Sequence, residues 1–473
     1  MRRGPVNRVA LIGLFVGPAL FCTLLWAPVP AELLGPPQRA LAVMALCMTW
    51  WLTTPVAMPV TSLLGMSLLP ILGVLDKNEA VALFGNQSVF FVIAAFISAA
   101  VMIRTGLSTR ITLFVLQRLS RSEDVLCGAV LAVAGGMTSV VVSHAVAALL
   151  LPIMVETLRA LGLEPGSRFA RRLLLSMAWG TIGGSNLSLL SSARASLATG
   201  MYEAYNTQHG LVHPPIGFFE YSSGTALVAV LSLVMAYFIL RWYHPPDGLD
   251  LAPAVAKLHE RAREMGDVSR AEWITAGGLV AMVVSLVLFG REYGLGTIAL
   301  LFSAGLFVTQ VIQWEDTERF VNWGVALLYG GAIAVAAAVQ ETGGIAFLVH
   351  AYLPIQSLDA WSIALACALL TVVITAFVSN AAAIALLLPL CLTLATEVGL
   401  NARAMTLLLP IAAGLDFSLP MSTPAMAMVF GTGYLRPADS VIPGIVLSIL
   451  GLGVLMLVAW GVWPLVGLPL VGG

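Results

Sequence analysis

Three side chains that can carry a charge stand within long apolar stretches, where a charge without a partner is costly. They are His144, Arg194 and Asp416. The planar fork of an arginine can grip an anion, a histidine titrates near neutral pH, and a carboxyl group can carry a proton or a cation. Structural interpretations exist as well: an ion pair between Arg194 and Asp416, or a buried histidine whose ring nitrogens are satisfied. The positions favour a role in binding ions.

Small and uncharged polar residues surround two of these side chains. The segment WGTIGGSNLSLLSSARASLATG, residues 179–200, places glycines and serines beside Arg194, and GLDFSLPMSTPAMAMVFGTG, residues 414–433, does so beside Asp416. At membrane depth, glycines and prolines free backbone amides and carbonyls, which are tolerated where they line a cavity. Exposed helix N-termini suit anions, and freed carbonyls suit cations. We predict that both segments are broken helices.

An internal repeat relates the two halves of the chain. The phrase VSHAVAALLLP at residues 142–152 returns as SNAAAIALLLP at residues 379–389, and the spacing from the final proline to a following leucine, Leu163 or Leu400, is the same. A broken segment follows each copy. With an odd number of crossings per half, the copies would lie in opposite orientations, which is a common construction of secondary transporters.

The composition is that of a membrane protein that crosses the bilayer several times. Of 473 residues, 59% are hydrophobic and 10% are charged, and the mean hydropathy is +0.96. We count about ten or eleven apolar runs long enough to cross roughly 30 Å of hydrocarbon, and we interpret the first, Val9–Trp26, as a retained helix. The cysteines lack metal-binding or redox spacing. No stretch is left for a soluble catalytic domain, and the few scattered ionisable residues argue against an enzyme.

Basic residues predict the topology. Arg2, Arg3 and Arg8 place the N-terminus in the cytoplasm, and the polar stretch 244–272 is a cytoplasmic linker. At this density the basic residues are topology signals, so no nucleic-acid partner is expected. The predicted organisation is an N-terminal helix (1–36), a first repeat (37–243), the linker (244–272) and a second repeat (273–473).

Three further segments resemble the divalent anion:sodium symporter family, DASS, of the solute carrier family 13 type. They are NQSVFFVIAAFISAAVMIRTGLSTRI (86–111), WEDTERFVNWGVALLYGGAIAVAAAVQETGG (314–344) and VFGTGYLRPADSVIPG (429–444). Members of this family carry dicarboxylates, citrate or sulfate. The resemblance implies an all-α inverted-repeat transporter of the inner membrane. It also implies a static scaffold, a mobile transport unit that works as an elevator, and a homodimer.

The resemblance further implies how the helices are arranged. It predicts about eleven transmembrane helices, two re-entrant hairpins and two broken helices. The hairpins are placed at about 128–158 and 364–396, and the broken helices at about 173–202 and 404–433.

Site residues follow from the positions that match the family's motifs. The predicted substrate-binding residues are Ser143, His144, Ser191, Arg194, Ser379, Asn380, Ala381, Thr423 and Pro424. The second half keeps a predicted sodium site formed by Thr375, Val378, Asn380 and Ser422. Oxygen ligands of this kind suit a hard cation. No cofactor is expected beyond sodium as a coupling ion.

The first half departs from the family's pattern. If the copies are aligned on serine, His144 replaces the sodium-binding asparagine; if they are aligned on proline, Ser143 stands there and His144 replaces a threonine. The turn expected to read Gly-Thr-Pro-Pro-Asn reads LSSAR at 190–194. We predict that Arg194 grips the substrate or replaces one sodium ion, and that Asp416 or His144 can take part in coupling.

The predicted function is secondary active transport of a small divalent anion, a C4-dicarboxylate or a sulfate-like species, coupled to one sodium ion. A sodium-independent, proton-coupled or anion-exchanging transporter of the same fold is the first alternative, because half of the cation machinery is altered. A cation/proton antiporter that uses Asp416 is the second. The predicted partners are the anion, sodium or protons, the lipid membrane and a second copy of the chain.

Overall fold

The computed structural model describes residues 8–210, 214–352 and 359–471, and its regular elements are helices. Arg2 and Arg3, predicted to mark the cytoplasmic side, lie outside the described residues. The helices up to the linker are α1 (Arg8–Trp26), α2 (Pro36–Thr53), α3 (Met58–Ile71), α4 (Lys77–Ala82), α5 (Gln87–Thr105), α6 (Leu107–Leu119), α7 (Glu123–Thr138), α8 (Ser143–Ala160), α9 (Arg168–Gly184), α10 (Ala193–Gln208) and α11 (Phe218–Tyr243).

Eleven further helices lie from the linker to the end of the described chain. They are α12 (Ala252–Glu264), α13 (Arg270–Tyr293), α14 (Leu295–Val308), α15 (Trp314–Phe320), α16 (Trp323–Glu341), α17 (Gly344–Tyr352), α18 (Ala360–Thr375), α19 (Asn380–Glu397), α20 (Ala402–Ala413), α21 (Pro424–Gly431) and α22 (Ala438–Gly461). Within the described residues, eight helices are long and apolar enough to cross a membrane, and four shorter helices are also apolar. The chain is therefore an all-α multi-pass membrane protein, while the number of crossings and the domain boundaries stay predictions.

The same order of elements occurs twice. Helices α7 and α8 form a hairpin that is followed by α9, a break and α10; α18 and α19 form a hairpin that is followed by α20, a break and α21. The helices after the breaks begin at N-cap residues of the types that favour helix starts. The Ser192 side chain accepts a hydrogen bond from the Ala195 amide, and the Thr423 side chain accepts one from the Met426 amide. Such caps satisfy amides that have no partner within the helix.

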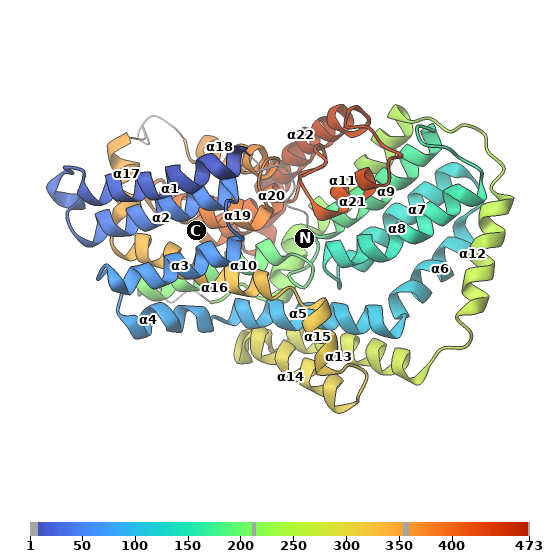
Figure 1. Cartoon of the computed structure of the whole chain (residues 1–473), viewed down its shortest axis with the longest axis horizontal. Coiled ribbons are helices and arrows are strands. Elements are labelled where there is room, and N and C mark those ends of the chain that lie inside the picture. Colours follow the sequence, from blue (N-terminus) through green and yellow to red (C-terminus); the bar gives the residue numbers. More distant parts are fainter. Residues whose placement is uncertain (1–7, 211–213, 353–358, 472–473) are drawn as a thin grey trace.

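The two copies exchange their last helices. Helix α10, from the first copy, packs against α19 and α20 of the second, and α21, from the second copy, packs against α8 and α9 of the first. In Figure 1 the hairpin α18–α19 lies in the left part of the molecule and α7–α8 in the right part, with α10, α20 and α21 between them. The breaks at 185–192 and 414–423 therefore meet at the centre.

Small residues allow the first hairpin to approach its broken helix closely. A Cβ atom added at Gly184 would lie 2.2 Å from the carbonyl oxygen of Gly135, and one added at Gly180 would lie 2.6 Å from that of Leu131. Since these contacts are with backbone atoms, a side chain at either position would separate α7 from α9. Close approach through small residues is a common way to pack helices in lipid.

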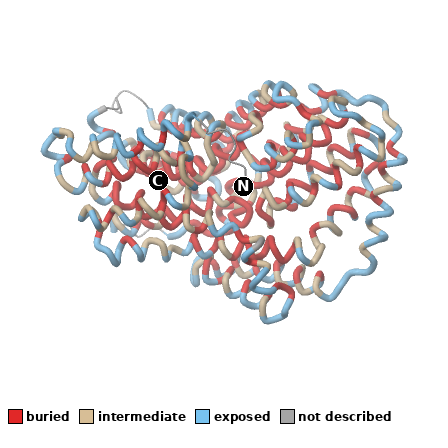
Figure 2. Tube along the Cα trace, viewed as in Figure 1, coloured by how far each residue is buried: buried red, intermediate tan, exposed pale blue. Residues whose placement is uncertain are grey.

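The outer helices expose apolar surface. Only 11% of the apolar stretch in α1 is buried, and 28% of that in α13. In Figure 2 the buried residues follow the interior of the molecule, while outer helices carry long exposed stretches. Large exposed side chains on these two helices include Phe15 and Leu288. Apolar surface of this extent is suited to lipid.

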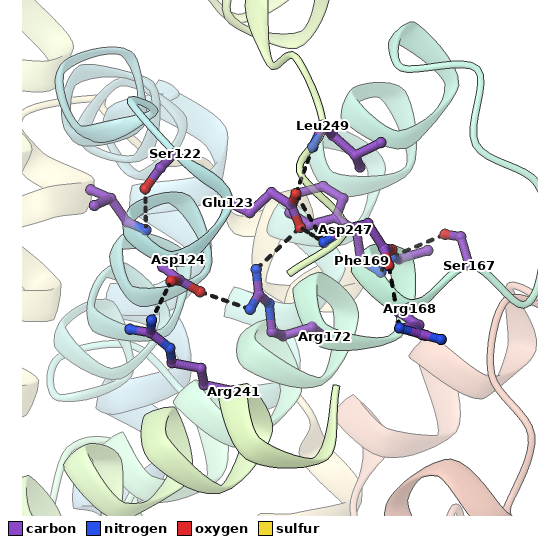
Figure 3. Close-up of polar contacts among 12 residues, drawn as sticks. Ser122, Glu123, Asp124, Ser167, Arg168, Phe169, Arg172, Arg241, Asp247 and Leu249 are labelled. Atoms are coloured by element: carbon purple, nitrogen blue, oxygen red, sulfur yellow. Dashed lines mark hydrogen bonds and ion pairs between the residues drawn. The ribbon is translucent and has the colours of Figure 1, made fainter. Parts of the chain in front are cut away.

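A charged cluster holds the linker against the base of the first hairpin (Figure 3). The carboxylate of Glu123, which is 4% exposed, accepts from the backbone amides of Asp247 and Leu249 at 2.7–3.1 Å. Arg172 on α9 donates to Glu123 and to Asp124. The cluster thus fixes the start of the linker to α7 and α9.

Candidate functional site

A cavity of about 220 Å³ lies where the two hairpin turns and the two helix breaks converge. Its lining comprises Phe96, Val142, Ser143, His144, Ile182, Ser185, Ser191, Ala193, Arg194, Asn322, Val325, Ser379, Asn380, Ala381, Asp416, Ser422, Thr423, Pro424 and Ala425. All nine residues predicted to bind substrate are in this set, as is Asp416. Of the predicted sodium ligands, Asn380 and Ser422 line the cavity, whereas Thr375 and Val378 do not.

Arg194 is held in place by neutral acceptors. The side chain is 7% exposed. Its Nε donates to the carbonyl oxygen of Pro410 at 2.8 Å, and its Nη2 donates to Ser185 Oγ at 3.0 Å and to Asn186 Oδ1 at 2.6 Å. None of these acceptors carries a negative charge, so they do not neutralise the positive charge of the guanidinium beside the cavity. Because Pro410 belongs to the second half and Ser185 and Asn186 to the first, the hydrogen bonds also fix the side chain between the two halves.

Gly414 makes room for this arrangement. A Cβ atom added there would lie 2.1 Å from Nη2 of Arg194 and 2.3 Å from Oδ1 of Asn186. The Asn186 amide also donates to the carbonyl oxygen of Gly414 at 3.3 Å. The first break thus packs directly on the second through an arginine, an asparagine and a glycine.

Asp416, in contrast to Arg194, is buried without hydrogen bonds to its side chain. Its side chain is 2% exposed, and neither carboxylate oxygen has a hydrogen-bond partner among the described residues, Arg194 included. The direct ion pair considered from the sequence is therefore not formed in this structure. The Asn380 amide lies nearby without a hydrogen bond of ordinary geometry to the carboxylate.

Side-chain donors occupy the backbone carbonyls of the second break. Trp179 donates to the carbonyl oxygen of Phe417 at 3.0 Å, Ser422 to that of Asp416 at 2.8 Å, and Ser440 to that of Ser418 at 2.8 Å. The sequence suggested that such carbonyls suit a cation. In this break they are mainly used to hold the irregular backbone in shape.

Two of the oxygens predicted to bind sodium, those of Thr375 and Asn380, lie close to each other. Thr375 Oγ1 donates to Asn380 Oδ1 at 2.7 Å and lies 3.2 Å from the carbonyl oxygen of Ala413. Three uncharged oxygens from α18, α19 and α20 thus converge on one point. A hard cation suits ligands of this type, so the donor set fits sodium, and Ala413 adds a ligand that the sequence did not indicate.

The helix starts settle the register of the two hairpins. Helix α8 begins at Ser143 and α19 begins at Asn380, at the same distance in sequence from their prolines. Ser143 therefore stands at the position of Asn380, and His144 at that of Ala381. The imidazole of His144 packs against Phe96, with ring centroids 5.8 Å apart.

Several residues that line the cavity or hold Arg194 could not be recognised from the sequence. Phe96 on α5 and Asn322, just before α16, reach the cavity from outside the hairpins and breaks. Ser185 and Asn186 hold Arg194 but carry no spacing that marks them. A paired-glycine segment that ends in Ser-Asn was the single local signal at these positions.

Comparison with known proteins gives the family. Residues 8–468 match the family described as sodium:sulfate symporter transmembrane region. The chain belongs to this family. It is therefore a membrane transporter and not an enzyme, as the sequence predicted, and the resemblance to the divalent anion:sodium symporters is confirmed.

Two curated relatives cover nearly the whole chain. The sodium-dependent dicarboxylate transporter SdcS of Staphylococcus saprophyticus is 28% identical, over 96% of this chain and 91% of its own length. The SdcS protein of Staphylococcus aureus is 25% identical, over 98% of this chain and 93% of its own.

Solved structures share the fold. The YdaH transporter of Alcanivorax borkumensis matches with a TM-score of 0.57 at 15% identity, covering 92% of this chain and 100% of that one. MtrF of Neisseria gonorrhoeae matches with a TM-score of 0.56 at 15% identity, covering 96% and 99%. At this identity the likenesses show a shared all-helical fold, as predicted from the sequence.

Proposed function

We propose that the protein carries a small divalent anion, a C4-dicarboxylate or a sulfate-like species, across the inner membrane with one sodium ion. The observation that carries this proposal is the cavity between the hairpin turns, in which Arg194 presents a positive charge whose hydrogen bonds go to neutral acceptors. The family and the names of the dicarboxylate-carrying relatives favour the same class of substrate.

The proposed substrate site combines charge with uncharged donors. Ser143, Ser191, Ser379 and Thr423 surround the cavity with hydroxyl groups. Helices α8, α19 and α21 begin beside it, and their N-termini favour an anion. A cavity of about 220 Å³ suits a small solute. His144 is the neutral donor that completes this set in the proposal.

Sodium is proposed to bind at the second-half site. Its ligands are Thr375, Val378, Asn380 and Ser422, with the carbonyl oxygen of Ala413 as a further candidate. The converging oxygens support this assignment. At the equivalent place in the first half, Arg194 supplies a permanent positive charge in our proposal, so that one sodium ion suffices.

The proposed role of Arg194 as a stand-in for one sodium ion can be tested directly. We expect Arg194→Asn, alone or with His144→Asn, to raise the sodium dependence of transport, because the lost charge must be supplied by a second ion. Loss of all anion binding with no gain in sodium response would contradict the stand-in role.

One observation favours a different function, a sodium-independent carrier or exchanger of the same fold. Arg194 already supplies a fixed positive charge in the first half of the site. A cation/proton antiporter that uses Asp416 is the remaining alternative. The two classes differ in whether an organic or inorganic anion crosses at all.

Transport assays separate these functions. The purified protein is reconstituted into liposomes, and uptake of radiolabelled succinate and sulfate is measured under sodium, proton and counter-anion gradients applied one at a time. We expect a sodium gradient to drive uptake of one dianion. Uptake that ignores sodium but follows internal anion would establish the exchanger, and absence of any anion flux would overturn the proposal.

The proposal includes the way the site moves. The hairpins and broken helices, α7–α11 and α18–α22, form a mobile transport unit that slides as an elevator along a scaffold built from α1–α5, α13, α14 and α16. The scaffold also forms the homodimer contact, and the N-terminus is cytoplasmic.

A further inference from the structure

Three residues of the proposed scaffold reach the cavity that the transport unit otherwise encloses. They are Phe96 on α5, Asn322 just before α16, and Val325 in the first turn of α16. The rest of the lining comes from the hairpin turns, α9 and the segments around the two breaks. In an elevator the scaffold stays behind when the transport unit moves. These three side chains therefore contact a bound solute in one of its two positions only.

Asn322 is unusual for an asparagine that precedes a helix. Such a residue ordinarily accepts a hydrogen bond from an amide in the first turn of the helix, but the Asn322 side chain does not cap α16. The residue is exposed at the cavity, and its side chain forms no hydrogen bond with a described residue. Its amide group is therefore free to donate to a ligand.

Arg194 provides donors at the buried end of the same cavity. Its Nε and Nη2 donate to protein acceptors, whereas Nη1 forms no hydrogen bond with a described residue. Arg194 is 7% exposed, while Asn322 is exposed. The cavity thus combines a buried cationic donor with a neutral donor nearer to the solvent. Two donors at different depths suit an anion that carries two separate charged groups.

Apolar side chains complete this part of the cavity. Phe96 and Val325 line it from the scaffold, and Val142 and Ile182 line it from the transport unit. Apolar surface of this kind suits the methylene groups of a dicarboxylate. It leaves the oxygens of a sulfate ion without hydrogen-bond partners, which is costly. Of the two proposed substrate classes, the lining therefore favours the dicarboxylate.

Ion pairs place Asn322 on the side of the scaffold where the linker lies. Arg104, near the end of α5, pairs with Asp316 on α15, the helix that directly precedes Asn322. Arg110 on α6, the next helix after α5, donates to a carbonyl oxygen of the linker at 2.8 Å and pairs with Glu272 at the start of α13. The end of α5 and the starts of α13 and α16 therefore share the linker side.

We propose that Asn322 binds the second carboxylate of a C4-dicarboxylate, whose first carboxylate faces Arg194, while the transport unit stands on the linker side. Asn322 thereby gives the site a preference for a dicarboxylate over sulfate, whose four oxygens surround a single atom. The contact is lost when the unit moves to the other side. This inference rests on the proposed function and names the substrate class of the same cavity.

The test measures transport of succinate and sulfate from each side of the membrane. Right-side-out and inside-out vesicles are prepared from cells that produce the full-length protein, with the same high sodium concentration outside both. In Asn322→Ala a hydrogen bond to a charged group is lost. We expect the KM of succinate to rise about tenfold in inside-out vesicles and to change little in right-side-out vesicles. Sulfate should keep its wild-type KM, or its inhibition constant against succinate, on both sides.

Two further variants separate a substrate contact from a structural role. Asn322→Asp has nearly the same shape and caps a helix as well as asparagine does, but its negative charge repels a carboxylate. We expect it to raise the KM of succinate in inside-out vesicles more than Asn322→Ala does. Asn78→Ala changes an exposed asparagine on α4, outside the cavity, and this matched control should behave like the wild type. Persisting uptake by right-side-out vesicles shows that each variant is folded.

The possible outcomes keep the inference apart from the proposed function. An unchanged KM of succinate in Asn322→Ala, an equal rise on both sides, or a rise confined to right-side-out vesicles would overturn the inference alone. A wild type that carries sulfate but not succinate also overturns the inference and leaves transport of a divalent anion standing. A wild type that carries neither anion overturns both.

Discussion

At the scale of single residues, the central feature is an arginine fixed before any substrate arrives. Pro410, Ser185 and Asn186 hold its guanidinium, so little ordering remains to be done on binding. The sequence indicated the importance of Arg194 because an intramembrane charge is costly. It could not indicate the acceptors, since one is a backbone carbonyl 216 residues away in the chain.

The lack of a side chain at Gly414 leads to a specific prediction. In Gly414→Ala the new methyl group would lie 2.1 Å from Nη2 of Arg194, so the guanidinium must shift. Loss of one hydrogen bond to a charged group costs about 1.5 kcal/mol, and we expect the affinity for the dianion to fall about tenfold. Gly431→Ala is the matched control, because its added Cβ atom meets no atom within 4 Å. Equal affinities of the two variants, measured by binding of labelled succinate, would contradict the role of this contact.

The sodium site makes another prediction at this scale. Asn380→Ala and Thr375→Val each remove one of the converging oxygens. We expect both variants to lose sodium-driven uptake, since a cation with fewer oxygen ligands is held less tightly. Uptake is measured as a function of sodium concentration. Thr371→Val is the control, because its hydroxyl donates within its own helix to Cys367. A sodium response in Asn380→Ala like that of the wild type would place the ion elsewhere.

At the scale of helices, the repeat could be predicted because both hairpins end in the same phrase and both breaks are rich in glycine, serine or proline. The predicted broken helix at about 173–202 corresponds to α9 and α10, which run from Arg168 to Gln208 around the break. The exchange of α10 and α21 between the two copies could not be predicted. It depends on which buried faces pack together, and these helices show no periodic pattern that names a partner.

The charged cluster at the base of α7 leads to a prediction about how the linker is attached to α7 and α9. Glu123→Ala removes acceptors from two backbone amides and from Arg172. Arg172 keeps its ion pair with Asp124, but the two backbone amides lose their acceptor. A buried donor left without an acceptor costs about 1 to 3 kcal/mol, so we expect a clear fall in apparent melting temperature in detergent. Arg168→Ala is the control, because that side chain is 63% exposed and lies 4.0 Å from Asp247. Equal melting temperatures for the two variants would show that the cluster does not hold the linker.

At the scale of the whole molecule, the proposed elevator requires α10 to slide past α5. Ser88 on α5 and Thr199 on α10 lie with their hydroxyl oxygens 3.2 Å apart, so cysteines at these positions would bring their sulfur atoms close together. We expect oxidation of the double variant Ser88→Cys and Thr199→Cys to stop transport and reduction to restore it. The single-cysteine variants serve as controls. Full transport with the disulfide formed would mean that these helices keep their relative positions.

The most direct measurement is a cryo-electron microscopy structure of the reconstituted protein with saturating succinate and sodium. We predict density for the dianion in the cavity between the two hairpin turns, within hydrogen-bonding distance of the hydroxyl groups and facing the guanidinium of Arg194. Density for sodium is expected among Thr375, Asn380 and Ala413. An empty cavity, or succinate bound elsewhere in a preparation that transports it, would contradict the account.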